Sequence, residues 1–451
     1  MRKIVLIFVL WTGCFSILFG KPNQVLPFQV GTAKVDITPS SENFSGIVSS
    51  VRDHLFCRAI VIKNDMTSAA LISIDHVMIS DEFYEEAILL IGEETGIPFQ
   101  NIIIAASHTH SGLKEDEISV SFVVDAVKQA KEKLQPASVS YGTGLSYINI
   151  NRDVIDQETG LWKQGPNYEG LSDKTVAVIT FRSKLGKPIA IYYNYAMHAN
   201  TMFMSGTLSA DFPGETSKYI EEYYGNGVVA LFSSGAAGDQ NPISTVPMEE
   251  AVHAMTEALI SNGKAKNFGE ALMIGLFGRI KIDLDKIDPG ILERQSQMVT
   301  SLGQILGEEV IRVTKMPQNI DSKISIYGAN KIITCPGRKR LDIGREGAPG
   351  TYIDGDPIDI KLSVLRIGDI AIAGVNAEVY SAIGQAVKEG SPLMKTIFSS
   401  IANGSSKSGY IPNDDAFQRY TFQVLNSSLK PNFAERSIID GLVEMIEKSS
   451  L

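Results

Sequence analysis

The chain has 451 residues, of which 44% are hydrophobic and 20% are charged, a composition that excludes a disordered chain and allows a sizeable core. The formal net charge of -10 argues against nucleic acid as a partner, because nucleic-acid binders need a clustered basic surface. Three cysteines cannot form a disulfide framework, and with only six histidines in the chain a cluster among them would be informative.

The first twenty residues predict an export signal. A basic pair precedes a mostly apolar, uncharged run of 16 residues, Ile4–Phe19, which is shorter than the roughly 20 residues that a spanning helix needs. We expect a cleaved signal peptide over residues 1–20, with an N-terminal anchor or a lipoprotein modified at Cys14 as alternatives. The protein is then secreted, periplasmic or on the cell surface. Cys57 and Cys335 would remain, and whether they pair is left open.

Beyond residue 20, short β-type runs alternate with segments of helical periodicity. Strands are expected at 58–63, 69–75, 101–107, 176–181, 188–195, 228–232 and 396–401, with a hairpin over 358–375. Helices are expected at 82–95, 120–134, 213–224 and 434–448, from Glu378 onward, and within 249–315, where Asp288-Pro289-Gly290 marks a break. This alternation predicts an α/β fold, a mixed β-sheet layered with helices, in one large catalytic domain over residues 21–451.

Two histidines follow directly after the buried-type strand at 101–107, in the segment Ser107-His108-Thr109-His110-Ser111-Gly112. Ligand groups in open α/β sheets gather beyond the carboxyl ends of strands, so this position favours a site. His108 and His110 would share one face if the segment is extended, and a turn between them would separate their directions. The alternative is a pair of loop histidines without a role, because two histidines alone are a weak metal signal.

Other candidates lie at the ends of later strands. His198 ends the strand at 188–195 and offers a further imidazole. Glu378 is, taken alone, most often a carboxylate at a helix N-terminus, and Tyr410 a packing aromatic. The glycine-rich segment with Gly235, Ala236 and Asp239 allows close backbone approach, and its N–H groups could stabilise an oxyanion; a tight turn is the alternative.

These motifs, in this order, resemble the neutral/alkaline non-lysosomal ceramidase family. The matching segments are 30–39 (VGTAKVDITP), 53–59 (DHLFCRA), the HTHSG at His108, 149–152 (NINR), 194–198, 208–214 (LSADFPG), the GAAGD at 235–239, Glu378, and 409–420. The resemblance implies an exported amidase that uses one zinc ion to hydrolyse ceramide, an N-acylsphingosine, or another N-acyl lipid.

The resemblance also implies residue roles. His108, His198, Glu378 and Tyr410 would be the zinc ligands, and imidazole, carboxylate and phenol are suitable donors. His110, Arg152 and Tyr420 would surround the substrate carbonyl. Zinc lowers the pKa of bound water from about 15.7 toward about 7, which supplies a nucleophile at neutral pH. Arg152 would hold the oxyanion, and His110 or Tyr420 would pass a proton to the leaving amine.

Two departures from the family pattern keep other functions open. The ceramidases carry a serine, often assigned as a nucleophile, where this chain has Gly235. They also carry a C-terminal β-sandwich domain, which we expect this chain, ending at Leu451, to lack. The same zinc site acting on an ester, lactone or glycosidic bond in a soluble substrate is therefore the second hypothesis, and a non-catalytic binding module is the third. Peripheral contact with a membrane surface and the oligomeric state are left open.

Overall fold

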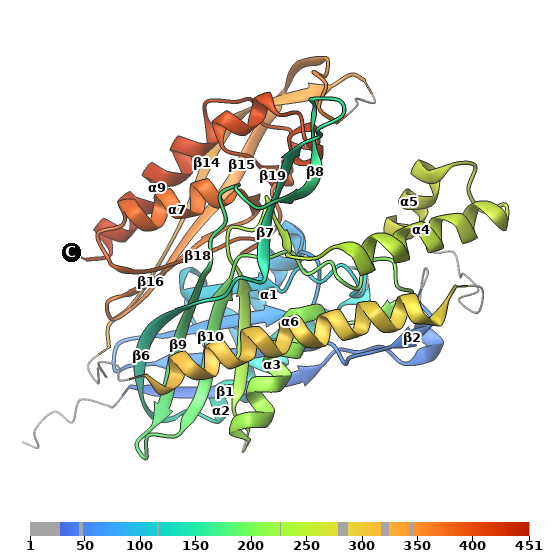
Figure 1. The fold of residues 1–451 in the computed structure, drawn as a ribbon. Coiled ribbons are helices and arrows are strands. Elements are labelled where there is room, and N and C mark those ends of the chain that lie inside the picture. Colours follow the sequence, from blue (N-terminus) through green and yellow to red (C-terminus); the bar gives the residue numbers. More distant parts are fainter. Residues whose placement is uncertain are drawn as a thin grey trace, which may run out of the picture.

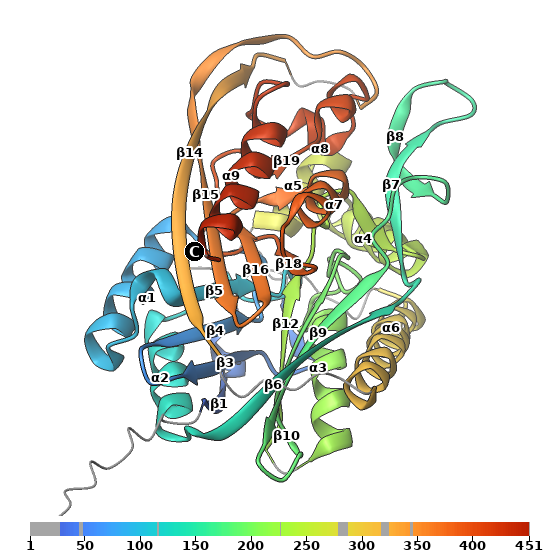
Figure 2. The same ribbon diagram turned by 90° about the vertical axis from the view of Figure 1, so that its left-hand side faces the viewer.

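The computed structural model describes residues 28–44, 48–114, 117–225, 227–277, 287–316, 324–342 and 346–450. The expected signal peptide at 1–20, with Cys14, lies outside this part of the chain. The predicted α/β fold with a mixed sheet and layered helices is confirmed (Figures 1 and 2). No helix among the described residues is both long and apolar enough to cross a membrane.

The largest sheet has eight strands in the order β12-β10-β9-β6-β1-β3-β4-β5. Within the sheet, a short antiparallel pairing of β1 with β6 joins its two halves. One half comprises β1 (Gln29–Asp36), β3 (Phe56–Lys63), β4 (Ser68–Ile74) and β5 (Ile102–Ala106). The other comprises β6 (Gln135–Leu145), β9 (Thr175–Ser183), β10 (Pro188–Tyr195) and β12 (Val229–Ser234).

The two halves face each other across a shared apolar core. Ile60, Leu71 and Ile103 from one half pack in the same cluster as Phe181 and Tyr192 from the other. The edge strand β12 consequently contacts β3, β4 and β5. Because the two halves face each other, the C-terminal ends of β5 and β10 lie close together, although these strands are far apart in the strand order.

Helices cover the outer face of each half. The first half packs against α1 (Asp81–Thr95) and α2 (Val120–Glu132). The second packs against α3 (Asp211–Tyr224) and α6 (Pro289–Lys315), which cross in front of the sheet in Figure 1. The burial of apolar side chains on both faces of each half explains why its strands are near-continuous hydrophobic runs.

A second sheet, of order β14-β15-β16-β18, extends the molecule on the side of the C-terminus (Figure 2). It is formed by β14 (Ile326–Arg340), β15 (Tyr352–Ile367), β16 (Ile370–Val375) and β18 (Lys395–Ser399), and it is covered by α7 (Ser381–Gly390) and α9 (Ala434–Lys448). Asn194 of β10 ties the two sheets together, because its Nδ2 donates to the Phe398 carbonyl at 3.1 Å.

The remaining elements are mostly short. They are β2 (Ser50–Val51), β7 (Asn149–Ile155), β8 (Trp162–Asn167), β11 (Thr207–Leu208), β13 (Gln240–Pro242), β17 (Glu378–Val379), β19 (Tyr410–Ile411), α4 (Val246–Ser261), α5 (Phe268–Phe277), α8 (Phe422–Leu425), and one-turn helices at Ser41–Asn43, Phe99–Asn101 and Asp414–Gln418. The α4–α5 pair projects from the body at the right of Figure 1.

The expected elements occur, with one error that matters for the site. Glu378 does not begin a helix: it lies in β17, and α7 begins only at Ser381. The Glu378 N–H donates to the Gly409 carbonyl at 3.0 Å, so β17 pairs in parallel with β19. This pairing partner is distant in sequence and left no local signal. Cys57 and Cys335 are both free and buried.

A close approach of α2 to β1 depends on Gly31, because a Cβ there would lie 2.0 Å from the Ala130 carbonyl oxygen. We predict that Gly31→Ala lowers the free energy of unfolding by about 1–3 kcal/mol or more, since the helix must shift outward. Gly92→Ala is the matched control: its Cβ would be 3.7 Å from the nearest atom, so α1 should gain about 0.5–1 kcal/mol from helix propensity. Chemical denaturation of both variants measures the difference, and equal stabilities would contradict the packing argument.

Candidate functional site

His108 follows the last residues of β5 and is held in an uncommon backbone conformation. Its φ of 66° lies in the left-handed region, which costs a non-glycine residue free energy and is found most often at functional sites. Its N–H donates to the His76 carbonyl at 2.9 Å, which supports this turn. Its side-chain Nδ1 donates to the Val77 carbonyl at 2.7 Å, so the buried ring presents Nε2 with a free lone pair.

His198 is held in a similar way after the end of β10. Its N–H donates to the Gln240 carbonyl at 3.0 Å, and its Nδ1 donates to the Ala237 carbonyl at 2.8 Å. The ring again presents Nε2. The two imidazole ring centroids lie 4.5 Å apart, and residues 109 and 199 form an isolated parallel bridge that holds the two strand ends together.

Glu378 completes this convergence from the C-terminal part of the chain. Its Oε2 lies 2.9 Å from His198 Nε2 and 3.2 Å from His108 Nε2. The three side chains are almost entirely buried, yet His108 Nε2 and Glu378 Oε2 make no hydrogen bond of acceptable geometry within the described part of the chain. Buried polar atoms without partners are costly, so donor atoms that converge in this way fit a metal ion.

The charge states suit metal binding as well. Burial, with contributions from Arg152 and His108, lowers the pKa of His198 to about 4, so this imidazole is neutral at neutral pH. Burial acts to raise the pKa of Glu378, but the neighbouring histidines outweigh it and hold that pKa well below its usual value. A neutral imidazole beside an ionised carboxylate is the form in which both groups bind divalent metals.

His110 and Tyr410 flank this group. The His110 ring contacts that of His108 at a centroid distance of 4.8 Å, and ligand atoms of His108, His110 and His198 lie within 4.8 Å of one another. His110 is therefore an alternative ligand that the sequence argument placed beside the substrate. Tyr410 stacks on His198 at 6.5 Å, and burial together with Glu378 raises its pKa while Arg152 opposes the shift.

Arg152 approaches the same group from β7. Its Nη2 lies 3.4 Å from His198 Nε2, and its guanidinium carbon lies 5.5 Å from the centre of the Tyr410 ring. The side chain is buried. The structure thus brings Arg152, which the family resemblance placed beside the substrate carbonyl, next to His198 and Tyr410.

The glycine-rich loop after β12 contributes differently from the sequence expectation. The Gly235 N–H donates to the Tyr195 carbonyl at 2.9 Å, so it is not available to an oxyanion. Ala236 packs in the core of the second sheet, and Asp239 accepts hydrogen bonds from Ser381 and Asn151. The loop instead supplies carbonyl oxygens, which orient His198 and Arg152.

The loop also leaves little room for a side chain at position 235. A Cβ at Gly235 would lie 3.0 Å from the Ala196 Cβ and 3.1 Å from Ala196 backbone atoms. A serine at this position would therefore require the strand end before His198 to shift by a few tenths of an ångström.

Tyr420 is the expected site residue for which the structure shows no contact with the histidines. Its side chain is partly exposed and, within the described residues, makes no hydrogen bond or ring contact with His108, His198 or Tyr410. The sequence analysis missed Gln423, which is fully buried beside Arg152 and Thr421. A single glutamine in a short helix carries no signal that could have singled it out.

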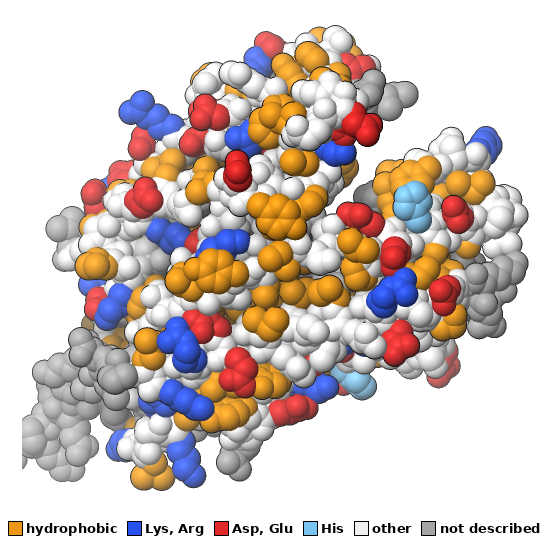
Figure 3. All heavy atoms as spheres, viewed as in Figure 1, with side chains coloured by type: hydrophobic (Ala, Val, Ile, Leu, Met, Phe, Trp, Pro, Cys, Tyr) orange, Lys and Arg blue, Asp and Glu red, His pale blue; other side chains and the backbone are white. Residues whose placement is uncertain are grey.

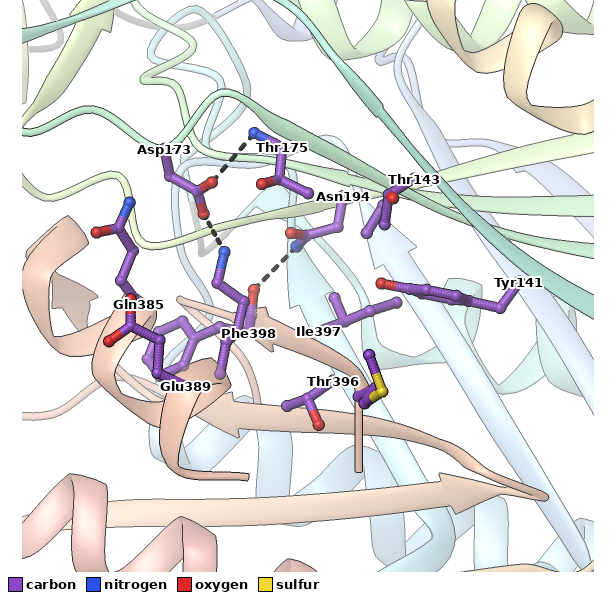
Figure 4. Close-up of a pocket in the computed structure, with 13 residues that line it drawn as sticks. Tyr141, Thr143, Asp173, Thr175, Asn194, Gln385, Glu389, Thr396, Ile397 and Phe398 are labelled. Carbon is purple, nitrogen blue, oxygen red and sulfur yellow. Dashed lines mark hydrogen bonds and ion pairs between the residues drawn. The ribbon is translucent and has the colours of Figure 1, made fainter. Parts of the chain in front are cut away.

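Two cavities lie in the part of the molecule where the sheets meet, and one of them adjoins the site. One of about 170 Å³ lies between β8, β13 and the start of α4, and it includes Asn241, whose Oδ1 accepts from Arg152 at 3.3 Å. Figure 3 shows the surface hollowed between the C-terminal part of the molecule and the projecting α4–α5 pair. A larger pocket of about 370 Å³, shown in Figure 4, lies between the two sheets and α7 and contains none of the candidate site residues.

Comparison with known proteins shows which family the chain resembles. The family model for the N-terminal part of neutral/alkaline non-lysosomal ceramidase matches residues 28–267. The neutral ceramidase of Pseudomonas aeruginosa is 25% identical over 266 residues, which cover 51% of this chain and 39% of that relative. The neutral ceramidase of Drosophila pseudoobscura pseudoobscura is 24% identical over 253 residues, or 48% of this chain and 36% of the relative. The sequence matches thus span less than half the length of these curated relatives.

Solved structures show that the likeness in fold extends further along the chain. A ceramidase complexed with C2 superimposes with a TM-score of 0.68 and 16% identity, over 94% of this chain and 75% of that one. The crystal structure of the Pseudomonas aeruginosa neutral ceramidase gives a TM-score of 0.67 at 15% identity, with the same coverage. The family match covers more than half of the chain, and the structural superposition extends over most of the remaining residues. The chain belongs to the neutral/alkaline non-lysosomal ceramidase family.

Proposed function

We propose that this member of a hydrolase family is a zinc-dependent amidase that cleaves the amide bond of ceramide or another N-acyl lipid. The observation that carries the proposal is the convergence of three buried side chains, His108, His198 and Glu378, in which His108 Nε2 and Glu378 Oε2 make no hydrogen bond among the described residues. The family membership supports the reaction class. The backbone carbonyls that orient both imidazoles support a metal role, because ligating histidines almost always donate their second nitrogen in this way.

His108, His198, Glu378 and Tyr410 would hold the zinc ion, which when bound polarises the substrate carbonyl and supplies a nucleophilic water at neutral pH. Arg152 would donate N–H groups to the oxygen that gains negative charge. His110 is partly buried, and its Nε2 makes no hydrogen bond with any described residue; it would move the proton to the leaving amine.

A different bond in a smaller substrate is the second candidate function. The cavity beside Arg152 is about 170 Å³, below the roughly 300–1,000 Å³ typical of pockets for drug-sized ligands, and Gln164, Thr245 and Glu249 give it polar walls. An ester, lactone or glycosidic bond in a compact polar substrate would fit this cavity better than a long acyl chain would.

The proposed metal site predicts that substitutions at different histidines have different effects on zinc binding and activity. His108→Ala and His198→Ala should each abolish zinc binding and hydrolysis, because each removes one of two fixed imidazoles. His253→Ala is the matched control, since His253 lies on α4 against Phe268 and should leave both properties unchanged. Metal content by mass spectrometry and turnover are measured on the same preparations. Full zinc occupancy with normal turnover in either site variant would contradict the assignment.

His110 separates the two possible ligand sets. If Glu378 and Tyr410 complete the site, His110→Ala should retain one zinc ion and lower kcat by about 100- to 10,000-fold, as expected for loss of a proton-transfer group. If His110 is itself a ligand, the variant should lose the metal instead. Zinc titration of the apo-protein distinguishes these results, and an unchanged kcat would exclude both roles.

Substrate class is tested with fluorescent short-chain ceramide, with and without a chelator. We expect release of labelled fatty acid that the chelator stops and added zinc restores. Matched ester and lactone substrates are assayed in parallel. Zinc-dependent turnover of these substrates, with none of ceramide, would establish the second candidate function in place of the first.

A further inference from the structure

We propose that Gln423 is a positioning residue for Arg152, and that it belongs to a charge-neutral cradle which leaves the guanidinium free to bind the acyl oxygen, including the carboxylate of the released acid. The inference rests on the proposed function for the identity of the acid. It assigns a role to a residue that no motif of the chain singled out.

Besides His198 Nε2 and the Tyr410 phenol, three neutral oxygen acceptors hold the guanidinium, and these three form the cradle. The Gly238 carbonyl accepts from Arg152 Nε at 3.1 Å and from Nη2 at 2.5 Å, and Asn241 Oδ1 accepts from Nη1 at 3.3 Å. With its amide oxygen turned toward Arg152, Gln423 accepts from Nε at 2.7 Å and from Nη2 at 3.2 Å, and its nitrogen donates to Thr421 Oγ1 at 3.2 Å. In the opposite orientation the amide NH2 group of Gln423 would face the N–H donors of Arg152. The first orientation satisfies the hydrogen-bonding groups of both residues.

A second buried arginine shows how unusual this arrangement is within the same protein. Arg58 and Arg152 are each only 3% exposed. Arg58 is neutralised by two carboxylates, Asp75 Oδ2 at 2.9 Å and Glu221 Oε1 at 3.2 Å. No carboxylate lies within ion-pair distance of Arg152 among the described residues. Burial acts to lower the pKa of Arg152, but its neighbours, the Glu378 charge among them, raise it, although Glu378 and Arg152 form no ion pair. A buried charge is normally paired directly, so a guanidinium without an ion pair indicates a site for an anion.

The direction of the guanidinium identifies that anion. Nη2 lies 3.4 Å from His198 Nε2, at the edge of the proposed metal centre. Nη1 donates to Asn241 Oδ1 and has a second N–H, which a ligand oxygen would take in competition with the Tyr410 phenol, a further partner of the guanidinium. An oxygen bound beside the metal centre would receive this donor. A fatty-acid carboxylate presents two oxygens and a full charge, and it would bind better than the matching neutral amide.

Gln423→Glu tests the cradle by changing one neutral acceptor into a carboxylate of the same shape. The zinc-loaded variant should bind octanoate at least about tenfold more weakly than the wild type, because the new carboxylate would form an ion pair with the guanidinium and neutralise its charge. Binding of octanamide should change less than about twofold, and zinc content should stay the same. Titration calorimetry measures both ligands without any turnover, so the result stands even if ceramide proves not to be the substrate.

Two further variants complete the experiment. Gln423→Met removes the acceptor without adding charge; it should lower kcat more than it raises KM, and weaken octanoate binding less than Gln423→Glu does. Gln385→Glu, in the pocket of Figure 4, adds the same charge away from the site and should leave octanoate binding unchanged. The proposal is overturned if Gln423→Glu binds octanoate like the wild type or loses octanoate and octanamide equally. A wild-type kcat in Gln423→Met would also overturn it.

Discussion

Two hydrogen bonds to backbone carbonyls determine what this site can do. Val77 and Ala237 each accept from the Nδ1 of a histidine, and this leaves both Nε2 lone pairs directed at one carboxylate oxygen of Glu378. A carbonyl oxygen held within the folded backbone cannot rotate away as a side chain can, so the imidazole orientation is set when the backbone folds. The remainder of the site, including Arg152 and Tyr410, gathers around two rings that are already fixed.

The backbone can provide this because the large sheet folds into two facing halves. His108 follows the edge strand β5 and His198 follows β10 in the other half, so a flat sheet would separate them by most of its width. The shared core between the halves brings the strand ends to a ring distance of 4.5 Å. The apolar side chains that stabilise the domain therefore also produce the geometry of the site.

Local sequence pattern predicted most strands and helices, because long apolar runs and regular helical spacing report burial directly. The strand-end positions of His108 and His198 were predicted in the same way. Glu378 was misassigned to a helix, since its pairing with Tyr410 depends on a partner distant in sequence. The carbonyls of the glycine-rich loop and the side chain of Gln423 could not be predicted, because their roles arise from three-dimensional neighbours and leave no periodicity. The grouping of Glu378, Tyr410 and Arg152 with the histidines came only from family resemblance.

The pairing of β17 with β19 has a consequence for the whole chain. The segment that matches the family model, residues 28–267, supplies both imidazoles, whereas the carboxylate comes from beyond it. An ion bound by all three would act as a non-covalent cross-link that closes a very long loop of the polypeptide. Its binding free energy would then stabilise the packing of the two sheets against each other. The metal centre would therefore contribute to the stability of the fold as well as to catalysis.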